Sequence, residues 1–187
     1  MNDEILANYL EALAVRLRMT AKPLANDHNL QHIHIQIIGY LGRCNHYSDT
    51  FLMLCDYLGQ TKGTVSKSVD KLQEKGYLEK RADPHDKRKS HLCLTQKGLS
   101  IYEKQRAVWS AVGSKMAPEE HTQTLYGLQS VLRQFQKMNK NRSFGTCTSC
   151  RHFNPGKNGG VCGLTNETLC AENLNLICAY HDENIGT

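Results

Sequence analysis

The feature that most constrains this chain is a crowding of cysteines near its C-terminus. Five of the eight cysteines lie in the 32 positions from Cys147 to Cys178, whereas Cys44, Cys55 and Cys93 are spread over everything before them. Cytosolic thiols are kept reduced, so a C-x-x-C pair followed by further cysteines favours a metal site over disulfides. We therefore expect this segment to bind zinc or an iron-sulfur cluster.

The length of the chain, 187 residues, allows one ordinary domain of roughly 100 to 200 residues and a small appendage. A segment of about 45 residues cannot build a sufficient core and usually needs a metal or a disulfide to fold. We predict a larger domain at residues 1–142 and a cysteine-rich, metal-binding extension at residues 143–187. The cysteines would thus meet a structural need as well as a functional one.

The first twenty residues lack the basic start, apolar run and cleavage site of a signal peptide. No stretch approaches the roughly 20 consecutive apolar residues of a membrane span, and the mean hydropathy is -0.52. We expect a cytoplasmic protein with no membrane partner. The formal net charge of +5 is only mildly basic, so nucleic-acid binding must be argued from where the charge lies.

Apolar residues recur at helical spacing in six stretches, each bounded by a capping residue or by a glycine or proline. The expected helices cover residues 3–23, 30–42, 50–59, 61–76, 95–116 and 118–138. Pro23 and the Asn26-Asp27 turn are expected to end the first, and Ser48 or Asp49 to cap the third. The chain is therefore predicted to be mainly α-helical.

Two of these helices, the third and the fourth, are joined by a tight turn at Gly59. This is the arrangement of a helix-turn-helix, in which the second helix enters the major groove of DNA. After Gly76, the segments YLEKRA and HLCLT have the character of strands, and the charged turn DPHDKRKS joins them. They predict a β-hairpin wing, which makes the fold a mainly α winged helix-turn-helix with a small β wing.

Positive charge is concentrated in the predicted helix-turn-helix and wing. Nine Lys or Arg and five Asp or Glu side chains lie between Thr61 and Ser90, a local net charge of about +4. With Val65, Val69 and Leu72 turned inward, the polar side of the fourth helix should face phosphates and base edges. The expected DNA-binding residues are Thr61, Lys62, Thr64, Lys67, Ser68, Lys71, Lys87, Arg88 and Lys89. Asp86 is expected to orient Arg88 or stiffen the wing turn.

The phrases GTVSKSVDKLQEKGYLEKR, DPHDKR and LTQKG resemble the DNA-binding core of the multiple antibiotic resistance (MarR) type of winged helix-turn-helix repressor. The flanking helices extend this resemblance over about residues 1 to 140. It implies a homodimer joined through the first and the last two helices, a palindromic double-stranded operator and repression of nearby genes. Many relatives also bind a small-molecule effector between the dimerisation and DNA-binding parts.

The extension beyond that resemblance has its own chemistry. Cys147 and Cys150 form one knuckle that can grip a metal, and Cys162 returns after NPGKNGG, whose glycines let backbone amides approach the sulfurs. The candidates for the fourth ligand are Cys178, Cys170, His152 and His181. A zinc ribbon normally presents two C-x-x-C knuckles, and only one is present, which weakens zinc without excluding it.

The pattern C-x-x-C-x-x-F-x-P, then G-x-C, then a last cysteine followed two residues later by an aromatic, resembles small domains of the high-potential iron-sulfur type. Such domains also occur on small subunits of glycyl-radical enzymes. In this resemblance Cys147, Cys150, Cys162 and Cys178 hold a 4Fe-4S cluster, and Phe153 and Tyr180 shield it. Cys170 is then a spare thiol.

Three functional hypotheses follow. The first is a dimeric transcription regulator whose cluster reports redox state, oxygen, nitric oxide or iron supply. The second is the same regulator with a permanent structural zinc and small-molecule control of DNA binding. A redox enzyme or electron-transfer protein is disfavoured, because no nucleotide loop, flavin signature or nucleophile-base pair accompanies the cysteines. We therefore expect no enzymatic activity, and we expect the three early cysteines to be buried and inert.

Overall fold

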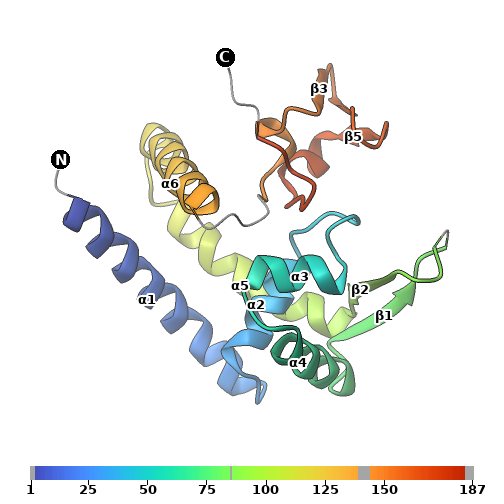
Figure 1. Ribbon diagram of the computed structural model, residues 1–187. Coiled ribbons are helices and arrows are strands. Elements are labelled where there is room, and N and C mark those ends of the chain that lie inside the picture. The colour runs from blue at the N-terminus through green and yellow to red at the C-terminus, as the bar shows by residue number, and fades with distance from the viewer. Residues whose placement is uncertain (1–2, 85, 139–143, 184–187) are drawn as a thin grey trace.

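The computed structural model describes residues 3–84, 86–138 and 144–183. Its main elements are α1 (Asp3–Asp27), α2 (His32–Leu41), α3 (Phe51–Leu58), α4 (Lys62–Glu74), β1 (Leu78–Ala82), β2 (Ser90–Leu94), α5 (Gln96–Gly113) and α6 (Pro118–Met138). The extension adds β3 (Phe153–Gly156), β4 (Gly159–Cys162), β5 (Thr168–Cys170) and two 3-10 turns, η1 (Cys147–Ser149) and η2 (Ala171–Asn175). The arrangement is mainly helical with a small β wing, as predicted (Figure 1).

Helix α2 is the centre of the hydrophobic core. Ile35, Ile37 and Ile38 are completely buried, because α1, α3, α4 and α5 pack around this one short helix. Tyr40, near its end, is also buried and donates a hydrogen bond from its hydroxyl to the carbonyl oxygen of Ser48 over 2.6 Å. The core thus holds the loop that follows α2 at Ser48.

Helices α3 and α4 form the predicted helix-turn-helix. Gly59 ends α3 in the left-handed conformation, with φ 61°, which a glycine adopts without strain. Thr61 then caps α4 by accepting a hydrogen bond from the amide of Thr64 over 3.2 Å. Val65, Val69 and Leu72 are buried, so the predicted inner stripe of α4 is confirmed.

Strands β1 and β2 pair antiparallel, with Leu78 opposite Leu94 and Arg81 opposite His91. Leu78 and Leu92 are buried at the base of this hairpin, while its tip extends away from the helices (Figure 1). The structure therefore has the predicted wing, anchored to the core by its leucines.

Two predicted helix boundaries need correction. Helix α1 ends at Asp27, in the expected Asn26-Asp27 turn, but Pro23 lies inside it. The helix continues past Pro23 because Ala21 and Ala25, four residues apart on one face, are buried in the core. Helix α3 is preceded by Thr50 rather than by a capping Ser48 or Asp49. Both of those side chains bind elsewhere, as described below.

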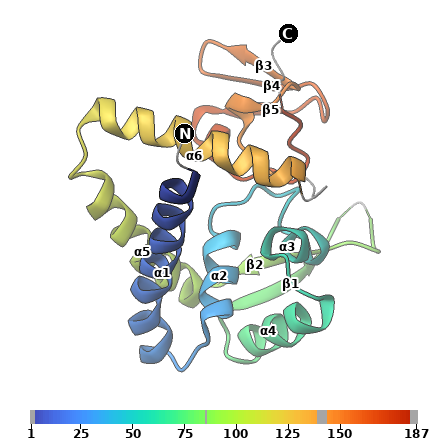
Figure 2. The same cartoon turned by 60° about the vertical axis from the view of Figure 1, so that its left-hand side comes forward.

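Long helices α1, α5 and α6 expose much apolar surface. None of the residues of α6 is buried, and this helix stands apart from the winged helix (Figure 2). Large apolar side chains that are exposed on these three helices include Ile5, Leu6, Tyr9, Leu13, Trp109, Val112, Leu125, Leu132 and Phe135. None of the described helices is long and apolar enough to cross a membrane.

The extension folds as a three-stranded antiparallel sheet, in the order β3-β4-β5, with irregular segments on either side. It packs directly on the loop between α2 and α3, residues 42–50. The amide of Ile177 donates to the carbonyl of Arg43 over 2.8 Å, and the amide of Asn45 donates to the carbonyl of Ile177 over 3.0 Å. The Ile177 side chain packs against the main core, so the extension and the larger domain share packing.

Candidate DNA interface and cysteine site

The outward face of α4 carries most of the predicted DNA-binding side chains. Lys62, Thr64 and Lys67 are exposed along it. Lys71 is also exposed, and its ammonium lies 2.9 Å from the carboxylate of Glu74 in a surface ion pair. This face therefore offers cationic and hydroxyl donors that suit phosphate oxygens and base edges.

Ser68 does not share this face, and the prediction that it points outward is wrong. Its side chain is only 6% exposed, and its hydroxyl donates to the carbonyl of Thr64 over 2.9 Å. The reason is helical geometry: Ser68 follows Val65 by three positions and precedes Leu72 by four, so it lies on the buried stripe. Thr61 is exposed, and its hydroxyl is the N-cap of α4.

The wing presents a second basic surface. Lys87, Arg88 and Lys89 are all exposed, and the Arg88 side chain is 91% exposed. The carboxylate of Asp86 accepts hydrogen bonds from the Arg88 amide over 3.0 Å and from its Nε over 3.2 Å. These bonds hold the pKa of Asp86 below its usual value. Asp86 therefore orients Arg88, as predicted. The Arg88 side chain itself remains exposed to solvent.

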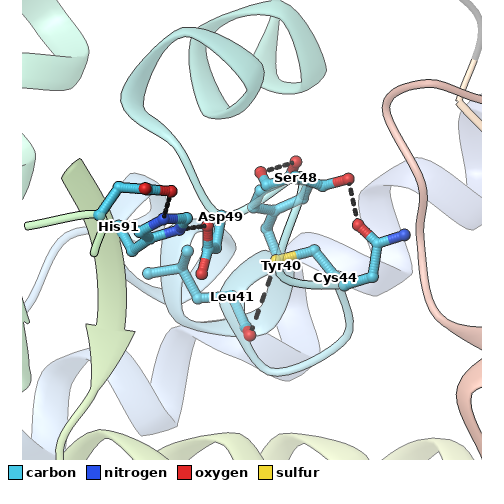
Figure 3. Close-up of polar contacts among 8 residues, drawn as sticks. Tyr40, Leu41, Cys44, Ser48, Asp49 and His91 are labelled. Carbon is cyan, nitrogen blue, oxygen red and sulfur yellow. Dashed lines mark hydrogen bonds and ion pairs between the residues drawn. The ribbon is translucent and has the colours of Figure 1, made fainter. Parts of the chain in front are cut away.

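A histidine joins the base of the wing to the loop of residues 42–50. His91 on β2 places its Nδ1 2.5 Å from Asp49 and its Nε2 3.0 Å from Asp83 (Figure 3). Hydrogen bonds to Asp83 and Asp49 raise the pKa of His91. Burial raises the pKa of Asp49, and its bond to His91 opposes that rise. The imidazole thus acts as a bridge between two carboxylates, and no sequence pattern indicated that these distant residues meet.

Four of the five clustered cysteines line a single cavity in the extension. Cys147 begins η1, Cys150 follows it, Cys162 ends β4 and Cys178 lies on the segment that packs against the loop of residues 42–50. Cys170 is exposed and does not line this cavity. The structure therefore brings together the preferred ligand set and leaves out the alternative fourth ligand.

Hydrogen-bond donors are directed at two of these sulfurs. The backbone amides of Thr165 and Leu164 donate to the sulfur of Cys162. Burial raises the pKa of the Cys162 thiol, but these bonds outweigh it and the pKa falls below its ordinary value. Burial also raises the pKa of Cys178, opposed by the side chain of Asn45 and the amide of Tyr180. Donors of this kind stabilise thiolates and tune iron-sulfur clusters.

Apolar and aromatic side chains enclose the cavity. Phe153 and Tyr180, the two expected shields, both line it, together with Leu164 and Leu169. A Cβ added to Gly160 would lie 2.5 Å from the Phe153 ring, so this glycine lets the ring approach. The glycine turn thus serves ring packing, whereas the amides that reach the sulfurs come from residues after Cys162 and Cys178.

The spacing of the donors bears on which group the cavity fits. Within residues 3–84, 86–138 and 144–183, no group of three or more His, Cys, Asp or Glu side chains is arranged to hold one metal ion. A tetrahedral zinc needs four ligands at about 2.0 to 2.3 Å from one point. In an iron-sulfur cluster each thiolate binds a different iron, so the four sulfurs that line the cavity need not converge on one point.

The two histidine candidates differ in position. His152 lines the cavity, whereas Nε2 of His181 lies 3.0 Å from the hydroxyl of Ser149, and His181 is not among the residues that line it. Burial lowers the pKa of His181. His152 is thus the histidine that lies nearer to the sulfurs.

Comparison with known proteins identifies the winged-helix part. Residues 28–89 match the sequence profile of the MarR family. This segment is therefore similar to the MarR family. The "HTH-type transcriptional regulator PetP" of Rhodobacter capsulatus is 31% identical over 104 residues, which cover 54% of this chain and 61% of PetP. The chain thus spans less than two thirds of the length of that relative. Both matches are to transcription regulators rather than to enzymes.

Solved structures share the MarR-family fold at low sequence identity. A MarR transcriptional regulator from Methanosarcina mazei Go1 is 19% identical with a TM-score of 0.59, over 72% of this chain and 99% of that protein. FabT of Streptococcus pneumoniae, solved in complex with DNA, is 21% identical with a TM-score of 0.55, over 73% of this chain and 99% of FabT. These likenesses establish the winged-helix fold.

Two residues of the MarR-family part contribute to the cysteine site and escaped sequence reasoning. Asn45 and Tyr47 line the cavity from the loop of residues 42–50. They lie about 100 positions from the cysteines and belong to no metal-binding pattern, so the sequence carries no signal for them. Of the early cysteines, Cys55 is buried as expected, whereas Cys44 and Cys93 are only partly buried. Burial raises the pKa of Cys44 to about 12, and it also raises the pKa values of Cys55 and Cys93.

Proposed function

We propose that this chain is a dimeric, DNA-binding transcription regulator, acting as a repressor, in which Cys147, Cys150, Cys162 and Cys178 hold a 4Fe-4S cluster. The observation that carries the proposal is that these four cysteines line one shielded cavity packed on a MarR-family winged helix. The cluster would make the regulator a sensor of redox state, oxygen or nitric oxide.

DNA binding is supported by two basic surfaces that belong to neighbouring elements. Lys62 and Lys67 are exposed on α4, and Arg88 is exposed on the wing. The fold is shared with FabT, which was solved with DNA bound. In a winged helix-turn-helix the second helix reads base edges in the major groove, and the wing contacts the backbone or the minor groove.

A homodimer is supported by the apolar faces of α1, α5 and α6, which one protomer leaves exposed. Contiguous exposed apolar surface of this kind marks an interface. A two-fold pairing would bury it and place two α4 helices on a palindromic operator. Leu132→Asp, on α6, should therefore dissociate the dimer in light scattering, whereas Gln134→Asp on the same exposed helix is the matched control.

A cluster is supported by the chemistry of the four-cysteine cavity. Four thiols are directed into one apolar space, hydrogen-bond donors meet two of the sulfurs, and aromatic rings limit access of water. When bound, a 4Fe-4S group supplies a redox centre that reacts with oxygen or nitric oxide. The residues of this chain hold it, donate hydrogen bonds to its ligands and shield it.

A second candidate function is control of DNA binding by a small molecule, with zinc as a structural staple. It is favoured by a cavity of about 680 Å³ between α1, α2 and α5, lined by Arg18, His32 and Trp109 among others. This volume lies within the range of about 300 to 1,000 Å³ typical of ligand pockets. Small-molecule control is compatible with a cluster, since the two cavities occupy different parts of the protomer, whereas zinc and a cluster exclude each other at the same cysteines.

The proposed function is tested by DNA titration of two forms of the protein. A duplex of about 30 bp, three helical turns, is first selected by the purified protein from a randomised library. Cluster-loaded and cluster-free protein are then titrated against it. We expect affinities that differ by about 5- to 150-fold, the usual range for coupled sites. Equal affinities would refute sensing, and failure to select any duplex would refute sequence-specific binding.

A further inference from the structure

The cysteine site and the wing are joined by hydrogen bonds that run through one loop, residues 42–50. The first link is at Asn45, which lines the cysteine cavity together with Cys178. Its backbone amide donates to the carbonyl of Ile177 over 3.0 Å, and its Oδ1 accepts a bond from the hydroxyl of Ser48 over 2.6 Å. A residue of the winged-helix domain is thus bonded to the chain neighbour of a proposed cluster ligand.

Ser48 is the junction of this path. It is completely buried, and its hydroxyl accepts a bond from the amide of Ala179, the residue after Cys178, over 2.8 Å. Its carbonyl accepts the bond from Tyr40 in the core. Figure 3 shows Ser48 above Tyr40, with Asp49 leading toward His91. Any shift of Ala179 would therefore strain a buried, fully engaged residue.

The path continues from Asp49 to the tip of the wing. The carbonyl of Asp49 accepts from the amide of Leu92 over 2.8 Å, and its carboxylate binds His91. His91 binds Asp83, whose carboxylate accepts from the amide of Asp86 over 2.7 Å. Asp86 in turn orients Arg88. Apart from the peptide bond between Ser48 and Asp49, every link is a hydrogen bond or ion pair between residues of one protomer.

We propose that this loop transmits the state of the cysteine site to the wing of the same protomer, and that it thereby controls DNA affinity through Arg88. The inference rests on the proposed function, because it presumes a cluster that can be bound or lost. Without the cluster, residues 177–179 lose their anchor at Cys178. Their bonds to Arg43, Asn45 and Ser48 are then free to break, and Asp49 moves with Ser48.

The alternative route, through the dimerisation helix α6, is less well connected. The extension contacts α6 through ion pairs from Arg133 and from Lys137 to Glu183, and through a bond from Gln136 to the carbonyl of Phe144 over 3.3 Å. Arg133 and Lys137 are about half exposed, whereas Glu183 is 17% exposed, so these pairs fasten the extension to α6. None of these contacts leads on to the wing. The loop of residues 42–50 is therefore the better connected route from the cysteine site to the wing.

The experiment measures the ratio of DNA affinities of the cluster-loaded and cluster-free forms for the wild type and four variants, with iron content determined for each. Asn45→Ala breaks the path at the cysteine end, and His91→Ala breaks it at the wing, away from the cysteine cavity. His46→Ala removes a surface contact of the same loop, 3.4 Å from Glu167, that is outside the path. Arg133→Ala breaks the link to α6.

We expect a wild-type ratio of about 5 to 150, a fall to about 1 in Asn45→Ala and His91→Ala, and little change in His46→Ala and Arg133→Ala. Hydrogen exchange of β2 should differ between the two forms in the wild type and not in Asn45→Ala. If Asn45→Ala does not bind a full complement of iron, His91→Ala alone tests the loop route. A wild-type ratio retained in His91→Ala, or lost in Arg133→Ala, overturns the loop route. A wild-type ratio of 1 instead overturns the sensor itself.

Discussion

The amide of Ala179 donates a hydrogen bond to the buried hydroxyl of Ser48 over 2.8 Å, although 131 positions separate the two residues in the chain. This bond fastens the cysteine-rich extension to the loop that also holds the base of the wing. Since Ser48 is completely buried, this hydrogen bond is part of the core and is not a surface contact. A change in the extension therefore has a short physical route to the DNA-binding surface.

The first prediction concerns the wing. Arg88→Ala should weaken binding to all DNA sequences and reduce the slope of log affinity against log salt by roughly one unit, because one phosphate contact is lost. Lys115→Ala is the control, since Lys115 lies in the α5–α6 turn, away from the wing in Figure 2. Titrations at several salt concentrations measure the slope. An unchanged slope in a folded Arg88→Ala dimer would exclude a phosphate contact.

The second prediction separates two neighbours on α4. Thr64→Ala should alter the preferred DNA sequence, because the Thr64 side chain is exposed on the outward face. Ser68→Ala should leave the sequence preference unchanged and cost about 1 kcal/mol of unfolding free energy, since it removes one buried hydrogen bond. Selection from a randomised duplex library and urea unfolding measure the two effects. A changed preference in Ser68→Ala would place that residue at the DNA after all.

The buried position of Ser68 could have been predicted from the sequence. Its position follows from the same period that correctly buried Val65, Val69 and Leu72, but its hydroxyl suggested a polar face. The helix-turn-helix, the wing and the orienting role of Asp86 were readable because they depend on local signals such as Gly59 and the capping threonine Thr61.

Other features could not be read from the sequence, because they depend on tertiary contacts. Asn45 and Tyr47 reach the cysteine cavity only because Ile177 packs beside the loop that carries them. Likewise, the continuation of α1 past Pro23 is decided by burial of Ala21 and Ala25, which outweighs the local preference of proline.

A third prediction concerns pH. The carboxylates of Asp83 and Asp49 raise the pKa of His91 above its ordinary value of about 6.5. A raised pKa in the folded state stabilises the fold fully below the unfolded value, and this contribution is lost as pH rises through the folded value. Wild type should therefore exceed His91→Gln in unfolding free energy by more at about pH 6 than at about pH 9. Denaturant unfolding at both pH values gives the comparison, and a difference that grows with pH would contradict the bridge.

A fourth prediction distinguishes the ligands from the spare thiol. Cys147→Ser, Cys150→Ser, Cys162→Ser and Cys178→Ser should each abolish iron binding and visible colour, because each removes a sulfur that lines the cavity. Cys170→Ser is the matched control and should retain both, since Cys170 is exposed outside the cavity. Iron content and visible absorbance of anaerobically purified variants provide the measurement. Loss of iron in Cys170→Ser with retention in Cys178→Ser would reverse the assignment of the fourth ligand.

The most direct test of the central claim is the metal content of the wild-type protein after anaerobic expression and purification, measured together with acid-labile sulfide and the visible spectrum. A 4Fe-4S cluster held by the four-cysteine cavity predicts a brown protein with about four irons and four sulfides per chain. A colourless protein with one zinc per chain would contradict the cluster and leave a winged-helix protein with a structural metal.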